Sequence, residues 1–232
     1  MRLSARRGDQ AGLTRTEVLA TLGGLLAILL FLLIPPWLAA RRMAQGIMCI
    51  KNLKEIGLAF RIFATDHDFR WPMDVPVPGG GTLDPTRNPE LLWRHYLGVS
   101  NELKSPKWLV CPRDPDRRPA EVFGQDPLHQ NSVVFAGNQH VSYFIGLEAN
   151  ESAIATDFGP TAILAGDRNL VADGQAVPAG RFTITGGQTL GFTAKRFHRG
   201  YGHLLLADGS VHETWSNRLS QAASVKNLLL VP

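Results

Sequence analysis

Apolar residues dominate one stretch near the N-terminus, which runs from Val18 to Ala40 without a charged side chain. A helix of this length would reach roughly 35 Å, and about 20 apolar residues are enough to cross the core of a bilayer. A single carboxylate, Glu17, stands directly before the stretch, where a charge is costly unless it has a partner. The pattern predicts one membrane-spanning helix with an acidic residue at its entrance.

A helical repeat of apolar residues continues beyond this stretch. Its members recur in alternating steps of four and three positions: Cys49, Leu53, Ile56, Phe60 and Phe63. This spacing places them on one face of a helix, while the charged residues Lys51 and Lys54 fall off that face. We expect the helix to run from about Thr16 to about Thr65, with its second half packed against a folded domain.

The last third of the chain has the pattern of an antiparallel sheet. Short apolar runs bounded by Gly, Asn or Asp predict strands at 140–145, 162–165, 181–185 and 201–207. The dipeptide Asp208-Gly209 predicts a two-residue hairpin turn, which pairs Leu206 with Val211 and Leu204 with Glu213. In this register the residues expected to face the long helix are Leu204, Leu206, Val211 and Trp215.

A short helix between Asn88 and Gly98 is predicted from its end signals, because Asn88 can cap a helix and Gly98 can end one. Taken with the strands, this predicts an α+β fold. It consists of a long N-terminal transmembrane and amphipathic helix packed on a C-terminal antiparallel β-sheet.

Charge determines the expected orientation and excludes one class of partner. Arg2, Arg6 and Arg7 precede the span, and basic residues beside a first span stay in the cytoplasm. The N-terminus should therefore be cytoplasmic and the rest of the chain extracytoplasmic. The formal net charge of +4 owes much to these arginines, and no run of five or more basic residues occurs in the chain. Nucleic-acid binding is not expected.

The two cysteines, Cys49 and Cys111, both follow the span. On the outer side of a membrane an oxidising compartment permits a disulfide between them. Two separate buried thiols remain the alternative. The cysteines lack the paired spacing of a zinc site, so metal binding through them is not predicted.

Histidines near the C-terminus raise the question of a metal site. In the predicted register His203 and His212 are diagonal neighbours, about 7–8 Å apart on one face of the hairpin. No third ligand is placed by spacing, so we expect exposed hairpin histidines and neither a metal nor a cofactor. No serine lies in a Gly-x-Ser-x-Gly turn and no His-Glu-x-x-His occurs, so an enzyme is not expected.

The N-terminal region resembles the processing site of type IV pilins and type II secretion pseudopilins. The residues that carry the resemblance are Gly12, then Glu17 five positions later, and the apolar helix that follows. The chain departs from the family pattern at Leu13, where phenylalanine is usual, and at Arg15 and Thr16, where apolar residues are usual. The resemblance implies cleavage after Gly12 by a prepilin peptidase, N-methylation of Leu13 and a role for Glu17 in assembly.

Further motifs are similar to a large group of prepilin-type bacterial proteins. They include His198 followed, after nine residues, by Asp208-Gly209, and four other segments: 52–59, 111–115, 142–144 and 166–170. The resemblance implies a structural subunit of a type II secretion or type IV pilus-like filament in the inner membrane, with other pilin-like subunits as partners.

The resulting division of the chain has four parts: a leader at 1–12, a transmembrane helix at 13–40, its amphipathic continuation at 41–67 and an α+β extracytoplasmic head at 68–232. The alternative function is that of a single-pass membrane-anchored extracytoplasmic binding domain that forms no filament. Such a protein would need the anchor but neither Gly12 nor Glu17.

Overall fold

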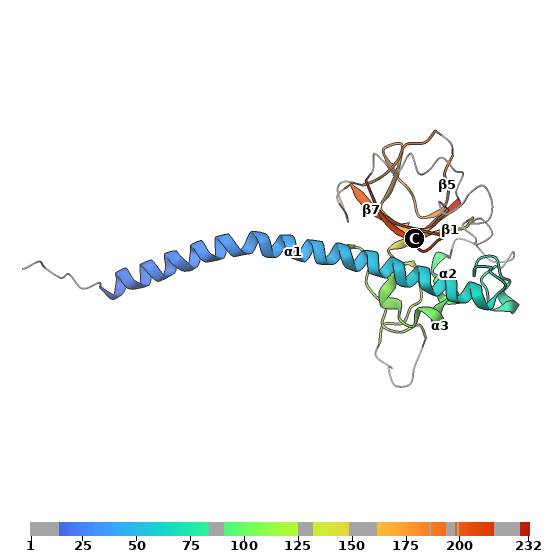
Figure 1. Ribbon diagram of the computed structural model, residues 1–232, viewed down its shortest axis with the longest axis horizontal. Coiled ribbons are helices and arrows are strands. Elements are labelled where there is room, and N and C mark those ends of the chain that lie inside the picture. The colour runs from blue at the N-terminus through green and yellow to red at the C-terminus, as the bar shows by residue number, and fades with distance from the viewer. Residues whose placement is uncertain are drawn as a thin grey trace, which may run out of the picture. The chain divides into compact units, whose positions relative to one another are not determined.

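The computed structural model describes residues 14–83, 91–124, 132–148, 162–185, 187–193, 198, 200–215 and 228–232. The chain divides between Ala44 and Gln45 into two compact units. The described residues form one long helix, several short helices and antiparallel strands, so the chain is an α+β protein (Figure 1).

The long helix α1 extends from Arg15 to Asp66, close to the predicted limits. Within the described residues it is the one helix long and apolar enough to cross a membrane. The apolar side chains of its first half are exposed, as Leu19 and Phe31 illustrate. An exposed apolar surface of this length suits contact with lipid.

The second half of α1 is amphipathic, as the sequence predicts. Its buried stripe contains the five residues that define the repeat, each at most 2% exposed: Cys49, Leu53, Ile56, Phe60 and Phe63. Beyond the helix Asp68 and Phe69 both adopt positive φ, at 55° and 57°, which right-handed helices do not use. These residues turn the chain away from the helix axis.

Short helices pack beside this part of α1. They are α2 at Leu92–Gly98 and α3 at Ser100–Leu103, with 3₁₀ turns at Val77–Gly79, Pro106–Leu109 and Asn138–His140. The ring of Tyr96 on α2 lies 6.2 Å from that of Phe60 on α1, in edge-to-face contact. The predicted end of α2 at Gly98 is confirmed, whereas its predicted start at Asn88 lies outside the described residues.

A six-stranded antiparallel sheet forms the centre of the head, in the order β5-β9-β1-β2-β7-β8. Its strands are β1 (Tyr143–Gly146), β2 (Ile163–Asp167), β5 (Gly180–Thr183), β7 (Tyr201–Leu206), β8 (Val211–Trp215) and β9 (Leu228–Val231). A second sheet joins β3 (Leu170–Ala172) to β4 (Gln175–Ala176) and β6 (Leu190–Phe192).

Both faces of the larger sheet are covered. One face contributes Tyr143, Ile145 and Leu205 to a core shared with α1. The other contributes Phe144 and Leu204 to a second core, which contains residues of the smaller sheet. The sheet is therefore the middle layer of the head.

The β7–β8 hairpin differs from the predicted one by its turn. Leu205, and not Leu206, pairs with Val211. The Leu206 amide donates to the Ser210 carbonyl at 2.9 Å, which leaves a three-residue loop. Gly209 has a φ of 81°, as expected for the left-handed residue that completes such loops.

For β7 the face predicted to meet α1 was wrong, whereas Val211 of β8 packs against the core shared with α1, as predicted. Leu205 packs on α1, whereas Leu204 and Leu206 belong to the second core. A Cβ added to Gly57 would lie 2.9 Å from Leu205 Cδ1, so a glycine at this point allows the helix to approach β7 closely. The physical reason for the error is that β7 is buried on both sides, and alternation does not tell one buried face from the other.

Candidate functional site

The predicted processing site, Gly12 and Leu13, lies outside the described residues. Glu17 is described, and its carboxylate accepts a hydrogen bond from the Thr14 amide at 2.8 Å. In return the Glu17 amide donates to Thr14 Oγ1 at 3.3 Å. This reciprocal pair is a capping box, which satisfies two amides at the start of α1. The signal, a threonine three residues before a glutamate and an apolar run, was present in the sequence.

Cys49 and Cys111 form a disulfide, with a Cα–Cα distance of 5.2 Å. Cys49 belongs to α1 and Cys111 to the loop after the 3₁₀ turn at 106–109, and both are fully buried. Beside it Asn52 Nδ2 donates to the Val110 carbonyl at 2.9 Å. The loop is thus attached to the helix by one covalent bond and one buried hydrogen bond.

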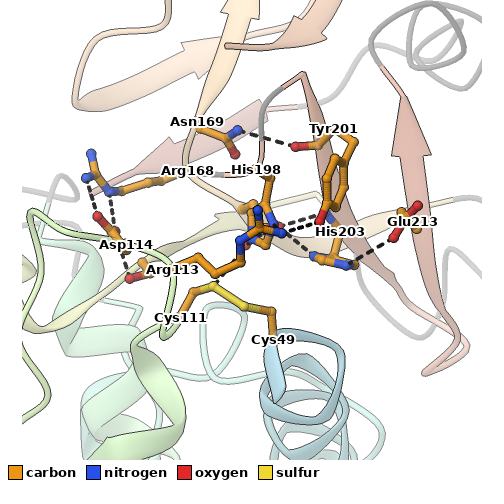
Figure 2. A network of polar contacts seen from close by, with 12 residues as sticks. Cys49, Cys111, Arg113, Asp114, Arg168, Asn169, His198, Tyr201, His203 and Glu213 are labelled. Carbon is orange, nitrogen blue, oxygen red and sulfur yellow. Dashed lines mark hydrogen bonds and ion pairs between the residues drawn. A yellow bond between two sulfur atoms is a disulfide. The ribbon is translucent and has the colours of Figure 1, made fainter. Parts of the chain in front are cut away.

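His198 lies directly against this disulfide (Figure 2). Its Nε2 is 3.4 Å from Cys111 Sγ and 3.4 Å from Asp167 Oδ2. Its Nδ1 is 3.3 Å from Arg113 Nη1, and a guanidinium can only donate. Nδ1 is therefore the acceptor and Nε2 carries the proton. Arg113 also donates to the Tyr201 hydroxyl.

His203 completes the cluster from strand β7. Its backbone amide and its Nδ1 both contact Asp167 Oδ2, at 2.8 and 2.9 Å. Its Nε2 lies 3.9 Å from a carboxylate oxygen of Glu213, a half-exposed residue on β8 (Figure 2). Asp167, His198 and His203 are all completely buried.

These positions correct the sequence-based expectation for the histidines. His198 and His203 are core residues and not exposed ones, and only His212 is exposed as expected. In the observed register His203 is paired with Glu213 and His212 with Leu204, so the two histidines point to opposite faces. Burial lowers the pKa of His198 to about 4, although the nearby Asp167 opposes this shift.

The ligand atoms of Asp167, His198 and His203 all lie within 4.8 Å of one another, which is close enough for a single metal ion. Two of the polar atoms in this cluster, Asp167 Oδ1 and His203 Nε2, have no hydrogen-bond partner in the part of the chain that the structure describes. The sequence pointed to His198, to His203 and to the segment 166–170 that contains Asp167, but it did not predict that they meet, because they come from three separate segments.

A second polar network adjoins the first. Arg168 binds Asp114 through two hydrogen bonds of 2.7 Å and Asp116 through one of 2.9 Å. Ser142 Oγ donates to the same Asp114 carboxylate at 2.8 Å. The hydrogen bonds from Arg168 to Asp114 raise the pKa of the arginine, which keeps the guanidinium charged.

Asp208 and Gly209 lie at the tip of the β7–β8 hairpin, where they stabilise the turn. The Asp208 carboxylate accepts a hydrogen bond from the Ser210 amide at 2.8 Å, and hydrogen bonding to Ser210 lowers its pKa. Gly209 supplies the left-handed conformation of the loop. Both residues set the hairpin that carries His203.

Segments that the sequence analysis singled out thus meet in space. Residues 111–115, 142–144 and 166–170 join through Asp114, Ser142 and Arg168, and His198 contacts the first and third of them. A buried network of this kind can fix the position of its segments and can bind a cation. Comparisons of the chain with protein-family models, with curated proteins and with solved structures found no match.

Proposed function

We propose that this chain is a pilin-like subunit of a type II secretion or type IV pilus-like filament, processed after Gly12 and methylated at Leu13. The observation that carries the proposal is the continuity of α1. Its first half is an exposed apolar helix of membrane-spanning length, and its second half forms part of the core of the head. A plain membrane anchor needs the first half but has no need to continue as the central helix of its domain.

The arrangement of the head supports this proposal. The segments similar to those of prepilin-type proteins are distant in sequence, yet they join in one buried network around the Cys49–Cys111 disulfide. If these segments together stabilise the fold of the head, this explains why they occur in the same chain. Their burial suits a structural part and not a surface that binds a substrate.

In the proposed setting the protein crosses the inner membrane once. The arginines of the leader keep the N-terminus in the cytoplasm, and the head lies in the extracytoplasmic space, where a disulfide is stable. Its partners are a prepilin peptidase and other pilin-like subunits. Assembly places the apolar halves of neighbouring α1 helices side by side, with the heads facing outward.

One observation favours the second candidate, a single-pass anchored domain that forms no filament. Glu17 already has a partner in the isolated chain, because it closes the capping box with Thr14. Its presence at the entrance of the span is thus also explained by helix capping. Processing after Gly12 distinguishes the two candidates, since an anchored domain does not require it.

The test is the intact mass of the protein purified from membranes in which a prepilin peptidase is present. We expect a chain that begins at Leu13 and carries one added methyl group. Gly12→Leu should abolish cleavage completely, because the bulky side chain replaces the residue at the cut. Gly8→Leu in the same leader is the matched control and should be cleaved normally. An uncut wild-type chain would overturn the proposal in favour of the anchored domain.

A further inference from the structure

The cluster of Asp167, His198 and His203 has the composition of a metal site. All three side chains are completely buried, and their ligand atoms lie within 4.8 Å of one another. Two imidazoles and a carboxylate are a donor set that binds zinc and related divalent ions. They come from the segment before β7, from β7 itself and from the end of β2, so the fold and not a local motif assembles them.

The distances between these atoms fit a common ion. Ligands about 2.0–2.1 Å from a tetrahedral Zn²⁺ lie roughly 3.3 Å from each other. Asp167 Oδ2 lies 2.9 Å from His203 Nδ1 and 3.4 Å from His198 Nε2, which brackets this value. The histidine nitrogens lie within 4.8 Å of each other, so all three atoms can surround one ion after a shift on the order of 1 Å.

The hydrogen bonding of the cluster is incomplete without a cation. Asp167 Oδ2 receives the amide and Nδ1 of His203, whereas Asp167 Oδ1 and His203 Nε2 are buried without a partner among the described residues. With Nδ1 donating, Nε2 carries a lone pair, as does Oδ1. Two buried lone pairs without a donor are costly. A cation bound to the carboxylate and to Nδ1 relieves both, because it offsets the charge of Asp167 and moves the His203 proton to Nε2.

We propose that Asp167, His198 and His203 form a buried binding site for a divalent transition-metal ion of the zinc class. The ion binds Asp167, His198 Nε2 and His203 Nδ1. Each imidazole remains neutral, because its proton moves to the other ring nitrogen. On His203 the moved proton points toward the Glu213 carboxylate, whose oxygen lies 3.9 Å from Nε2 and must come about 1 Å closer to accept it.

The same proton shift on His198 has a consequence for Arg113. Once Nδ1 carries the proton it can no longer accept from Arg113 Nη1, which lies 3.3 Å away. Arg113 must then keep only its hydrogen bond to Tyr201. The arginine therefore opposes the ion both by charge and by hydrogen bonding, and its removal should strengthen binding.

The experiment uses the full chain in detergent, purified with a tag free of histidine and stripped of metal by a chelator. Zn²⁺ is added, the excess is removed, and bound metal is measured by elemental mass spectrometry. We expect about one ion per chain in the wild type and in His212→Gln, the matched control with an exposed histidine on the same hairpin. His203→Gln should lose the ion.

Two further variants test the geometry and not only the presence of ligands. Arg113→Gln should bind Zn²⁺ more tightly, by about tenfold or more, because an amide oxygen can accept the proton of His198 Nδ1 and the positive charge is gone. Glu213→Ala, which removes the acceptor for the His203 Nε2 proton, should bind about 10–100-fold more weakly. Replacing Zn²⁺ with Co²⁺ gives visible absorption bands that report tetrahedral coordination. Arg113→Gln also covers the case in which His203→Gln does not fold.

Several results would overturn the proposal. They are a wild-type chain that retains no zinc, equal retention by a folded His203→Gln, and unchanged affinity in Arg113→Gln. Reductant is omitted, because free thiols of Cys49 and Cys111 beside His198 would offer zinc other ligands. Uptake that appears only after reduction would place the ion at the cysteines instead. None of these outcomes depends on filament assembly.

Discussion

His95 is a buried imidazole that the head keeps neutral. It is 8% exposed, and its Nδ1 lies 2.6 Å from Thr82 Oγ1. The threonine uses its own proton to bind the Pro72 carbonyl, so Nδ1 of His95 is the donor in this contact. Burial lowers the pKa of His95 from 6.5 to about 4. The folded state therefore binds a proton less readily than the unfolded state.

This shift predicts a loss of stability in acid. Above pH 6.5 His95 is neutral in both states and the effect is absent, whereas below this value the unfolded chain takes up a proton that the folded chain refuses. Between pH 7 and pH 4.5 the group should remove about 2–3 kcal/mol from the free energy of unfolding. His95→Asn keeps a donor near Thr82 but does not titrate. Its denaturation midpoint should fall less over this range, and an identical pH dependence would show that His95 is not responsible.

The burial of His203 could not be predicted from the sequence, and the reason lies in its hydrogen-bond partner. His203 and His212 stand nine residues apart on one hairpin, and nothing in the local pattern marks one as buried and the other as exposed. His203 is buried because Asp167, a residue of another strand, receives both its amide and its ring. Such long-range partners are not visible in local spacing.

At the scale of elements, the Cys49–Cys111 disulfide joins α1 to a loop that has little secondary structure. The two cysteines are 62 positions apart, and closing a loop of this length should stabilise the head by roughly 4 kcal/mol through the unfolded state. Replacing both cysteines with alanine should lower the free energy of unfolding by about this amount. The measurement is equilibrium denaturation of the oxidised wild type and of the double variant.

The control for the disulfide is the wild-type chain unfolded under reducing conditions. It should resemble the double variant, since both lack the covalent link. A double variant as stable as the oxidised wild type would mean that hydrogen bonds such as Asn52 to Val110 suffice to hold the loop.

The elements themselves could be predicted to different degrees. The buried stripe from Cys49 to Phe63 could be predicted, because the period of a helix alone determines which of its residues share a face. The register of the hairpin was harder to predict, because Asp208-Gly209 fits both a two-residue and a three-residue turn. The two turns shift the pairing by one residue, and this shift changes which side chains of β8 lie on the same face as a given residue of β7. The capping box of Thr14 and Glu17 could be predicted from their spacing, but the sequence analysis considered only the charge of Glu17.

At the scale of the whole molecule, Glu17 has two possible tasks that make different demands on its side chain. Capping needs an acceptor for the Thr14 amide, which a neutral amide oxygen also provides. In a filament we expect the Glu17 carboxylate to pair with the N-terminal amine of a neighbouring Leu13 in a dry environment, which requires its negative charge. A carboxylate can accept several hydrogen bonds, so one partner does not prevent the other.

Glu17→Gln and Glu17→Ala separate these tasks. A buried charge pair that loses one member is destabilised by about 3–5 kcal/mol, so both variants should fail to form the oligomer ladders that crosslinking of neighbours gives in cells. Both should still insert and be cleaved after Gly12, since neither step uses the charge of Glu17. If Glu17→Gln gives the same ladder as the wild type while Glu17→Ala does not, helix capping is the task of Glu17. Equal ladders from all three would show that assembly depends on neither the charge nor the capping role of Glu17, and the continuity of α1 would then have to explain assembly alone.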